Sequence, residues 1–289
     1  MRRRIMQRSG TPVPNPPDRQ PLIGVLDSGV GGLSVLREIH RLLPAHPTLY
    51  VADQAHLPYG TRSKTDIFAF VDAIATAMMA QGARAIVLAC NAASAASLHA
   101  LRDHYPGFPF VGIEPAVKPA AETTRSGVIG VLTTQATADG DLFRATISRF
   151  ASHVQVITQP APALVHLVES GEWDTEAARQ VMHAELDPLL AAGADQIALA
   201  CTHFPFLIEP LSQIAGNRAA FIDPGPAVAR QLVRVLAAAG FSSDQTGLPP
   251  QHRYVTSGDP ARLGAMIQRL LGLETTVEQA VWMQSGLSL

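Results

Sequence analysis

The chain has two cysteines, Cys90 and Cys201, and they occur in two segments of similar sequence. Residues 82–91 read GARAIVLACN and residues 193–202 read GADQIALACT, so Gly, Ala, Ile, Leu, Ala and Cys coincide at six of ten positions. A lone buried cysteine usually packs as a small apolar side chain. Two cysteines at the same place in two copies favour a chemical role instead. Two like groups on opposite sides of one substrate can act as acid and base in a reaction that runs both ways.

A disulfide between the two cysteines is the alternative. A chain of 289 residues can form a large core and does not need a covalent crosslink. The N-terminus carries arginines but no apolar run after them, so it does not resemble a signal peptide, and we expect a reducing cytoplasm and free thiols.

Apolar, β-branched runs alternate along the chain with alanine-rich segments of helical length. The runs predict strands at 22–26, 48–52, 85–89, 110–113, 128–132, 154–158, 196–200 and 220–222, and the other segments predict helices at 64–81, 140–151 and 175–192. This alternation predicts an α/β fold with parallel sheets. Both cysteines follow a predicted strand, where the ligand crevice of such sheets lies, and a helix N-terminus after each is expected to lower the thiol pKa.

The repeat extends beyond the cysteines, because the tetrapeptide IGVL occurs at 23–26 and again at 129–132. We expect two similar lobes related by a pseudo-twofold axis, with the active site in the cleft between them. The first lobe is predicted to hold residues 22–115 and 222–289, and the second residues 116–221. A helix should begin at Asp259–Pro260, since aspartate caps helices and proline suits their first turn. Residues 1–21 contain five prolines and are expected to be a disordered tail.

Other polar residues lie at predicted strand ends. The segment DSGVGG (27–32) starts with Asp27 and Ser28, and its glycines allow backbone N–H groups to approach an anion such as a small carboxylate; a tight turn capped by Asp27 is the alternative. The segment TTQAT (133–137) offers hydroxyl groups at the equivalent place in the second lobe.

Three further side chains could assist the thiols. His203 follows Cys201 by two residues and could hold a proton near that thiol. Glu169 ends a predicted helix and Asp53 follows a predicted strand, although an exposed glutamate is the default for the former. The loop LPYG (57–60) also lies at a strand end and could be only a turn.

Composition excludes several classes of protein. The formal net charge is −2, without a basic patch that would indicate nucleic-acid binding, and no run of about 20 apolar residues could span a membrane. The ten histidines show no metal-ligand spacing, so neither a metal nor another cofactor is expected.

Together these segments resemble glutamate racemases of the Asp/Glu racemase superfamily. The matching pieces follow the family order from residue 22 onward: GVLDSGVGGLSVLREI (24–39), YVADQAHLPYGTRS (50–63), LACNAAS (88–94), GIEPAVKPA (112–120), GVLTTQAT (130–137), LVHLVESG (164–171), LACTHFP (199–205), IDPG (222–225) and TSGDPARL (256–263).

The resemblance implies an isomerase that interconverts L- and D-glutamate without a cofactor and supplies D-glutamate for peptidoglycan. It implies proton transfer by Cys90 and Cys201. The assisting acid–base groups would be Asp27, Asp53, Glu169 and His203. Substrate contacts would come from Asp27, Ser28, Tyr59, Gly60, Asn91, Ala92, Thr134, Thr137, Thr202 and His203. Glutamate is the expected small-molecule partner, with no nucleic acid and no membrane; a homodimer is left open.

The chain departs from the usual family pattern at three places. Ala92 replaces a threonine, and only its backbone N–H remains for a substrate contact. LACTHFP stands where LGCTHYP is usual, and the QAHL stretch before Pro58 also differs from the commoner form. Two alternatives therefore stay open: a racemase of aspartate or another small acid, and a non-catalytic protein that binds a small molecule or a partner.

Overall fold

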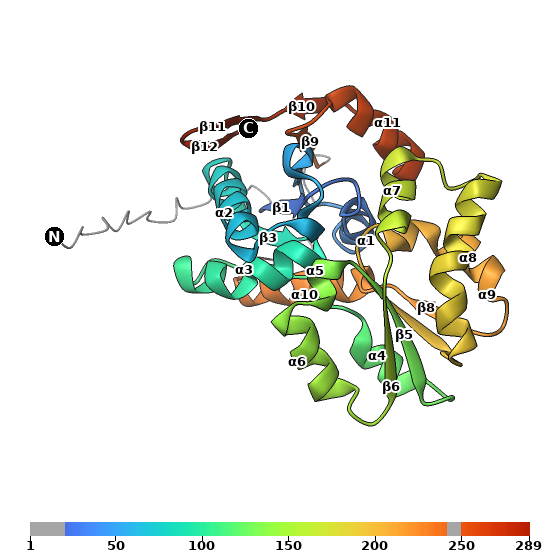
Figure 1. Cartoon of the computed structure of the whole chain (residues 1–289). Helices are drawn as coiled ribbons and strands as arrows, with labels where there is room; N and C mark the ends of the chain where they lie inside the picture. Colours follow the sequence, from blue (N-terminus) through green and yellow to red (C-terminus); the bar gives the residue numbers. More distant parts are fainter. Residues whose placement is uncertain (1–20, 242–249) are drawn as a thin grey trace.

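The computed structural model describes residues 21–241 and 250–289, which form two lobes, each with a parallel sheet (Figure 1). The predicted α/β class with two similar lobes is confirmed. In the first sheet of the described chain the strand order is β10-β9-β2-β1-β3-β4. These strands are β1 (Leu22–Asp27), β2 (Thr48–Ala52), β3 (Ala83–Leu88), β4 (Phe110–Gly112), β9 (His252–Thr256) and β10 (Val277–Gln279).

The second sheet repeats the topology of the first. Its order is β6-β5-β7-β8, which matches β2-β1-β3-β4 strand for strand. Its strands are β5 (Val128–Thr133), β6 (Gln155–Pro160), β7 (Gln196–Ala200) and β8 (Ala220–Ile222). Because the two IGVL segments lie in β1 and β5, and the cysteines follow β3 and β7, the sequence repeat corresponds to a repeat of the fold.

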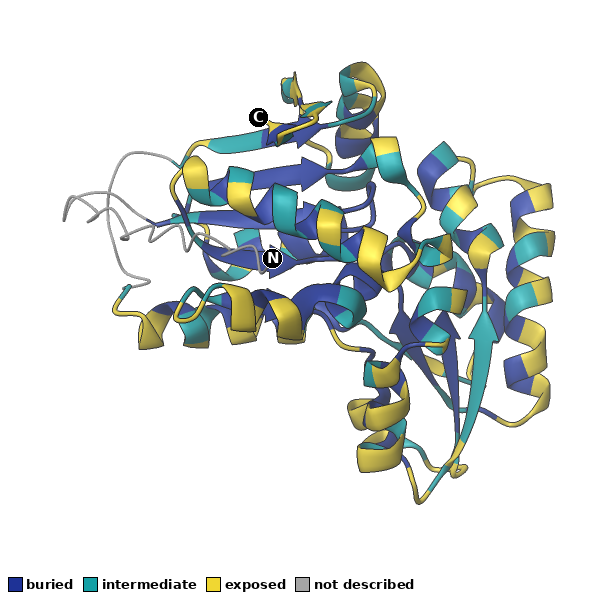
Figure 2. Cartoon of the chain, turned by 60° about the vertical axis from the view of Figure 1, so that its left-hand side comes forward, coloured by how far each residue is buried: buried dark blue, intermediate teal, exposed yellow. Residues whose placement is uncertain are grey.

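Helices cover both sheets, as the buried strands require (Figure 2). The first lobe contains α1 (Leu33–Leu42), α2 (Lys64–Ala80), α3 (Asn91–His104), α10 (Gly225–Ala238), α11 (Pro260–Leu271) and the 3₁₀ turns η1 (Gln54–His56) and η2 (Tyr59–Thr61). The second contains α4 (Val117–Thr123), α5 (Gln135–Ala138), α6 (Asp141–Phe150), α7 (Pro162–Ser170), α8 (Glu176–Ala191), η3 (Phe204–Leu207) and α9 (Ile208–Ala215). None of the helices in the described ranges is long and apolar enough to cross a membrane.

Several predicted boundaries differ from the observed ones for a simple reason. The ranges predicted for α2, α6 and α8 each included the residues that cap the helix, such as Gly140, Thr175 and Gln81. The capping prediction for α11 is confirmed, since the Asp259 side chain accepts hydrogen bonds from the backbone N–H groups of Ala261 and Arg262. The predicted tail lies outside the described residues, apart from Pro21.

The end of the described chain lies against the first sheet. Helix α10 packs on α1, and β9 pairs in parallel with β2. A two-stranded antiparallel hairpin of β11 (Val281–Met283) and β12 (Gly286–Ser288) follows and packs on α2, as Figure 1 also shows.

One cluster of buried apolar side chains extends through both lobes. It joins Val25 and Leu36 of the first lobe to Leu132, Val168 and Leu199 of the second. Two smaller clusters of the described residues each lie within one lobe. The shared cluster fixes the two sheets relative to each other, so their carboxyl ends keep a defined separation.

Candidate active site

The two cysteines occupy equivalent positions at the carboxyl ends of the sheets. Cys90 lies two residues after β3 and is the N-cap residue of α3, while Cys201 follows β7 directly. Each is 6% exposed, and both thiols are free. Burial raises the pKa of Cys90 above its usual value, and the charges of Asp27 and Cys201 add to the rise.

A hydrogen-bonded chain of side chains leads away from Cys201. The Cys201 Sγ lies 3.5 Å from Nδ1 of His203, whose Nε2 lies 2.7 Å from Oε1 of Glu169. Glu169 also accepts a 3.0 Å hydrogen bond from the backbone N–H of Val30, which follows β1 of the other lobe. Both His203 and Glu169 are buried, so the exposed-glutamate alternative is wrong.

Charge and hydrogen bonding set the protonation of His203 and Glu169. Burial acts to lower the pKa of His203, but the Cys201 thiol and the Glu169 carboxylate beside it raise that pKa well above its usual value. Burial acts to raise the pKa of Glu169, yet the hydrogen bond and charge of His203 hold it below its usual value. The pair is therefore an imidazolium and a carboxylate, with the imidazolium next to the Cys201 sulfur.

Cys90 has different neighbours. Ser28 Oγ lies 3.9 Å from the Cys90 Sγ and 3.2 Å from Oδ1 of Asp27. The other carboxylate oxygen of Asp27 accepts hydrogen bonds from the backbone N–H of Gly32 and, at 3.2 Å, from the hydroxyl of Thr202. Asp27 thus touches a residue beside each cysteine, and its complete burial raises its pKa above the usual value.

The expectation that a helix N-terminus would lower the thiol pKa is wrong for Cys90. Burial and the negative charge of Asp27 raise the pKa of Cys90, and together they outweigh the hydrogen bond from the Ala93 backbone N–H. Cys90 is consequently a thiol at neutral pH, the form that can donate a proton.

The glycine-rich loop after β1 serves the protein's own carboxylates. Its Val30 and Gly32 N–H groups donate to Glu169 and Asp27, so these two groups bind side chains rather than a substrate anion. A Cβ atom at Gly29 would collide with the Glu169 carboxylate, and one at Gly31 would collide with the ring of His203. Glycine is needed here so that the loop of the first lobe can reach the Cys201 side.

The predicted substrate-binding residues also gather at this edge. Gly60 faces Thr134 across the cleft, since a Cβ at Gly60 would lie 3.5 Å from the Thr134 side chain. The Thr134 hydroxyl donates to that of Thr137 at 3.0 Å. Asn91 is 5% exposed, and both polar atoms of its amide lack a hydrogen-bond partner in the described chain. The Asn91 amide therefore has both a donor and an acceptor free for a polar ligand or for water.

Asp53, predicted to assist a thiol, forms its hydrogen bonds with side chains other than the cysteines. It is fully buried, and its Oδ2 accepts from the Tyr59 hydroxyl and lies 2.8 Å from Nδ1 of His56. Its Oδ1 accepts from the Ser257 hydroxyl at 2.7 Å and the Trp282 indole N–H at 2.8 Å. These four partners of Asp53 were not predicted from the sequence. Ser257 lies in the TSGDPARL segment, which could have signalled it, whereas nothing in the sequence pointed to Trp282.

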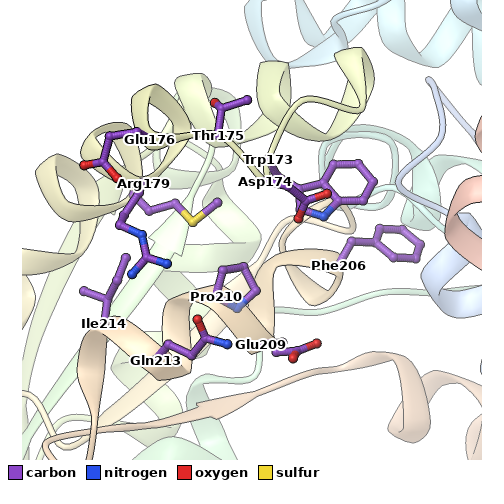
Figure 3. A pocket seen from close by; sticks show the side chains of 11 residues that line it. Trp173, Asp174, Thr175, Glu176, Arg179, Phe206, Glu209, Pro210, Gln213 and Ile214 are labelled. Carbon is purple, nitrogen blue, oxygen red and sulfur yellow. The ribbon is translucent and has the colours of Figure 1, made fainter.

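Two cavities in the described part of the molecule are considered as binding sites. One, of about 330 Å³, opens at the cleft between the lobes, with Gly60 and Ala92 on one side and Gln135 and Ala136 on the other. The other, of about 350 Å³, lies between α8 and α9 (Figure 3). It is lined by Trp173, Asp174, Thr175, Glu176, Arg179, Met182, Phe206, Glu209, Pro210, Gln213 and Ile214, a set that includes none of the predicted site residues. The cleft cavity is therefore the candidate substrate site.

Within residues 21–241 and 250–289, no group of three or more His, Cys, Asp or Glu side chains is arranged to hold a metal ion. The two thiols, each with its own ionisable or hydroxyl neighbours, offer acid–base chemistry at the carboxyl ends of the two sheets.

Comparison with known proteins agrees with this arrangement. Residues 23–232 match the model of the Asp/Glu/Hydantoin racemase family. The glutamate racemase of Ectopseudomonas mendocina is 49% identical over 256 residues, 88% of this chain and 96% of that protein. The Escherichia coli glutamate racemase, solved with L-glutamate and the activator UDP-MurNAc-Ala, is 34% identical with a TM-score of 0.80, over 91% of this chain and 99% of that one.

The Francisella tularensis glutamate racemase, solved with D-glutamate, is 25% identical with a TM-score of 0.78, over 91% of this chain and 97% of that one. This coverage extends over both lobes. The matched thiols at the ends of equivalent strands, the repeated topology and the family match over most of the chain lead to one assignment: the chain belongs to the Asp/Glu/Hydantoin racemase family.

Proposed function

We propose that the protein is a glutamate racemase, an isomerase that interconverts L- and D-glutamate by proton transfer between two thiols and needs no cofactor. The observation that carries the proposal is the pair of buried cysteines at equivalent strand ends, together with relatives near 50% identity that are glutamate racemases. The D-glutamate serves peptidoglycan synthesis, and the cytoplasm is its proposed location.

Racemisation removes the Cα proton from one face of the amino acid and returns a proton to the other. That proton is far less acidic than a thiol, so the enzyme must position the thiolate, exclude water and stabilise the carbanion. Cys201 takes the proton from L-glutamate, and Cys90 donates its own to the opposite face. The reaction from D-glutamate reverses these roles.

The neighbours of each thiol suit these roles. The His203 imidazolium, 3.5 Å from the Cys201 sulfur, stabilises a thiolate there, and Glu169 keeps the imidazole protonated. On the other side, the raised pKa of Cys90 keeps that thiol protonated, so it holds the proton that the opposite face receives. When D-glutamate is the substrate, Cys90 must lose its proton, and Asp27, whose own pKa is raised, can accept it through Ser28.

The substrate is proposed to bind between the cysteines, in contact with both lobes. The unpartnered amide of Asn91 and the backbone N–H of Ala92 hold it from the first lobe, with Ser28, Tyr59 and Gly60 beside them. Thr134, Thr137, Thr202 and His203 hold it from the second lobe.

The proposed first lobe consists of residues 22–115 and 222–289, and the proposed second lobe consists of residues 116–221. The pairing of β9 with β2 supports this division, because it returns the end of the described chain to the first sheet.

The test uses the purified full chain with single enantiomers of glutamate and aspartate, followed by circular dichroism. Either enantiomer of glutamate should be converted to the equilibrium mixture, and a chelator or a carbonyl reagent should leave the rate unchanged because the thiols supply both acid and base. Turnover of aspartate without turnover of glutamate would reject the proposed substrate. No turnover of any amino acid would leave only a binding protein on this fold.

A further inference from the structure

The Asp53 carboxylate connects two parts of the first lobe that are far apart in sequence. On one side its Oδ2 accepts the Tyr59 hydroxyl at 2.8 Å, in the turn that continues to Gly60. On the other side its Oδ1 accepts the indole N–H of Trp282, 229 residues further along the chain, at 2.8 Å. With His56 and Ser257 also bound to it, this carboxylate is surrounded by four side-chain partners and is fully buried.

Trp282 reaches Asp53 from the hairpin of β11 and β12, whose outer side chains are exposed. Its neighbours in β11, Val281 and Met283, are each 54% exposed, whereas the Trp282 ring packs edge-on against His56 at 4.8 Å between centroids. On β12, Leu287 is buried in the apolar cluster that includes α2. The hairpin thus packs on α2 and directs the indole N–H of Trp282 toward Asp53.

Tyr59 carries this constraint to the substrate site. The tyrosine is 1% exposed, and its turn η2 packs against α3, which begins after Cys90, and against α5 of the second lobe. Gly60 faces Thr134 of the second lobe and lines the cleft cavity. A shift of the Asp53 carboxylate would move the Tyr59 hydroxyl and with it this wall of the cavity.

We infer that the C-terminal hairpin positions the substrate-binding turn, by holding Asp53 through the indole N–H of Trp282 so that Asp53 holds Tyr59 and Gly60. Asp53 is then a positioning residue and not an acid–base group. A carboxylate with a partner at every side has little freedom to relay a proton. The inference rests on the proposed function, since the turn is a wall of the proposed glutamate site.

Kinetics of the full-length Trp282→Phe variant test this. Phenylalanine keeps an aromatic ring but removes the N–H, so the KM for both glutamate enantiomers should rise about 3- to 10-fold, within the range for losing a typical intramolecular hydrogen bond. The kcat should change less than about twofold and the primary isotope effect with Cα-deuterated glutamate should stay the same, because neither thiol moves. Met283→Ala, in the same hairpin but with an exposed side chain, should leave both constants unchanged.

A hairpin that only stabilises the fold would behave differently. Trp282→Phe would then lower the melting temperature but leave KM at its wild-type value well below that temperature, and this result would overturn the inference. A fall in kcat with a changed isotope effect would overturn it as well, since Asp53 would then act on the chemical step.

A binding measurement separates this inference from the proposed function. The chain has two tryptophans, so Trp173→Phe leaves Trp282 as the sole emitter. Adding D-glutamate should shift Trp282 emission, because the indole N–H bonds the carboxylate that supports the site, and Tyr59→Phe should reduce the shift at least several-fold. An unchanged Trp282 emission at saturating D-glutamate would contradict the proposed link between the hairpin and the substrate site. A shift in a protein that racemises nothing would reject the enzyme and keep the coupling.

Discussion

At the scale of single residues, the two thiols are equivalent in topology but not in surroundings. Cys201 has an imidazolium 3.5 Å away, while Cys90 has a serine hydroxyl and the buried Asp27 behind it. The first environment stabilises a thiolate and the second stabilises a thiol. A duplicated fold has therefore placed a matched pair of sulfur atoms in different surroundings.

Replacement of either cysteine by alanine should abolish racemisation from both enantiomers, because one face loses its only proton carrier. Cys90→Ser and Cys201→Ser should keep at most traces of activity, since a hydroxyl is a much poorer base. Circular dichroism follows the substrate, and the far-ultraviolet spectrum of each variant checks that it is folded. Near wild-type activity in either alanine variant would rule out the two-thiol mechanism.

His203 and Asp27, which assist the thiols, should each act mainly on one of the two proton-removal steps. His203→Asn should slow proton removal from L-glutamate more than from D-glutamate, and Asp27→Asn should show the opposite bias, each by about 10²- to 10⁴-fold on the affected step. Equilibrium fixes the ratio of kcat/KM in the two directions, so the bias is measured by isotope effects with Cα-deuterated enantiomers or by single-turnover exchange. Equal slowing of both steps in both variants would reject the assignment of helpers to sides.

At the scale of elements, α11 supports the Cys201 side from the other lobe. Arg262, in its first turn, donates from Nη2 to the backbone carbonyl of Glu169 at 3.2 Å. Its positive charge is one of the causes, after burial and His203, that set the pKa of Glu169. A helix capped by Asp259 thus delivers a cation to the end of α7.

Arg262→Gln removes that charge and should move the acid limb of the pH profile of kcat/KM to higher pH. Without the cation the pKa of Glu169 rises, so the carboxylate that keeps His203 protonated is lost at a higher pH than in the wild type. Arg262→Lys keeps the charge and is the matched control, whose acid limb should stay close to that of the wild type. A glutamine variant with an unchanged profile would show that Arg262 has no electrostatic role.

At the scale of the whole molecule, a second group of titratable residues sits at the opposite end of the first sheet. His40 and His252 lie with ring centroids 4.0 Å apart, and each has a ring nitrogen within 3.0 Å of the Thr48 hydroxyl. Burial lowers the pKa of His40 from 6.5 to about 4, with the neighbouring His252 as a further cause, and burial lowers that of His252 as well.

This cluster should make the protein less stable in weak acid. The unfolded chain binds protons at these histidines below about pH 6.5 while the folded chain does not, so the free energy of unfolding falls as the pH decreases from about 6.5 to about 4. The shift of His40 corresponds to at most about 3 kcal/mol. Urea unfolding of His40→Gln across this range should show a shallower dependence on pH, with exposed His153→Gln as the control. An identical dependence in both variants would exclude the cluster as the cause.

Much of the architecture could be predicted because its signals are local. The burial of a strand and the cap of a helix depend on neighbouring residues, and so β2, β7 and β8 have their predicted bounds and Asp259 caps α11. The repeat of ten residues around each cysteine marks equivalent places in two copies of one unit. The sequence by itself therefore determined the fold class, the duplication and the position of both thiols at strand ends.

Only the tertiary structure decided how the site residues are partnered. Glu169 meets His203 across 34 residues and Val30 across 139, and Trp282 meets Asp53 across 229. The pattern of the sequence does not encode such contacts, because they arise from how the lobes and the hairpin pack. The rise in the pKa of Cys90 also depends on the tertiary structure. The helix N-terminus that would lower this pKa is visible in the sequence, whereas the burial and the Asp27 charge that outweigh it exist only when the chain is folded.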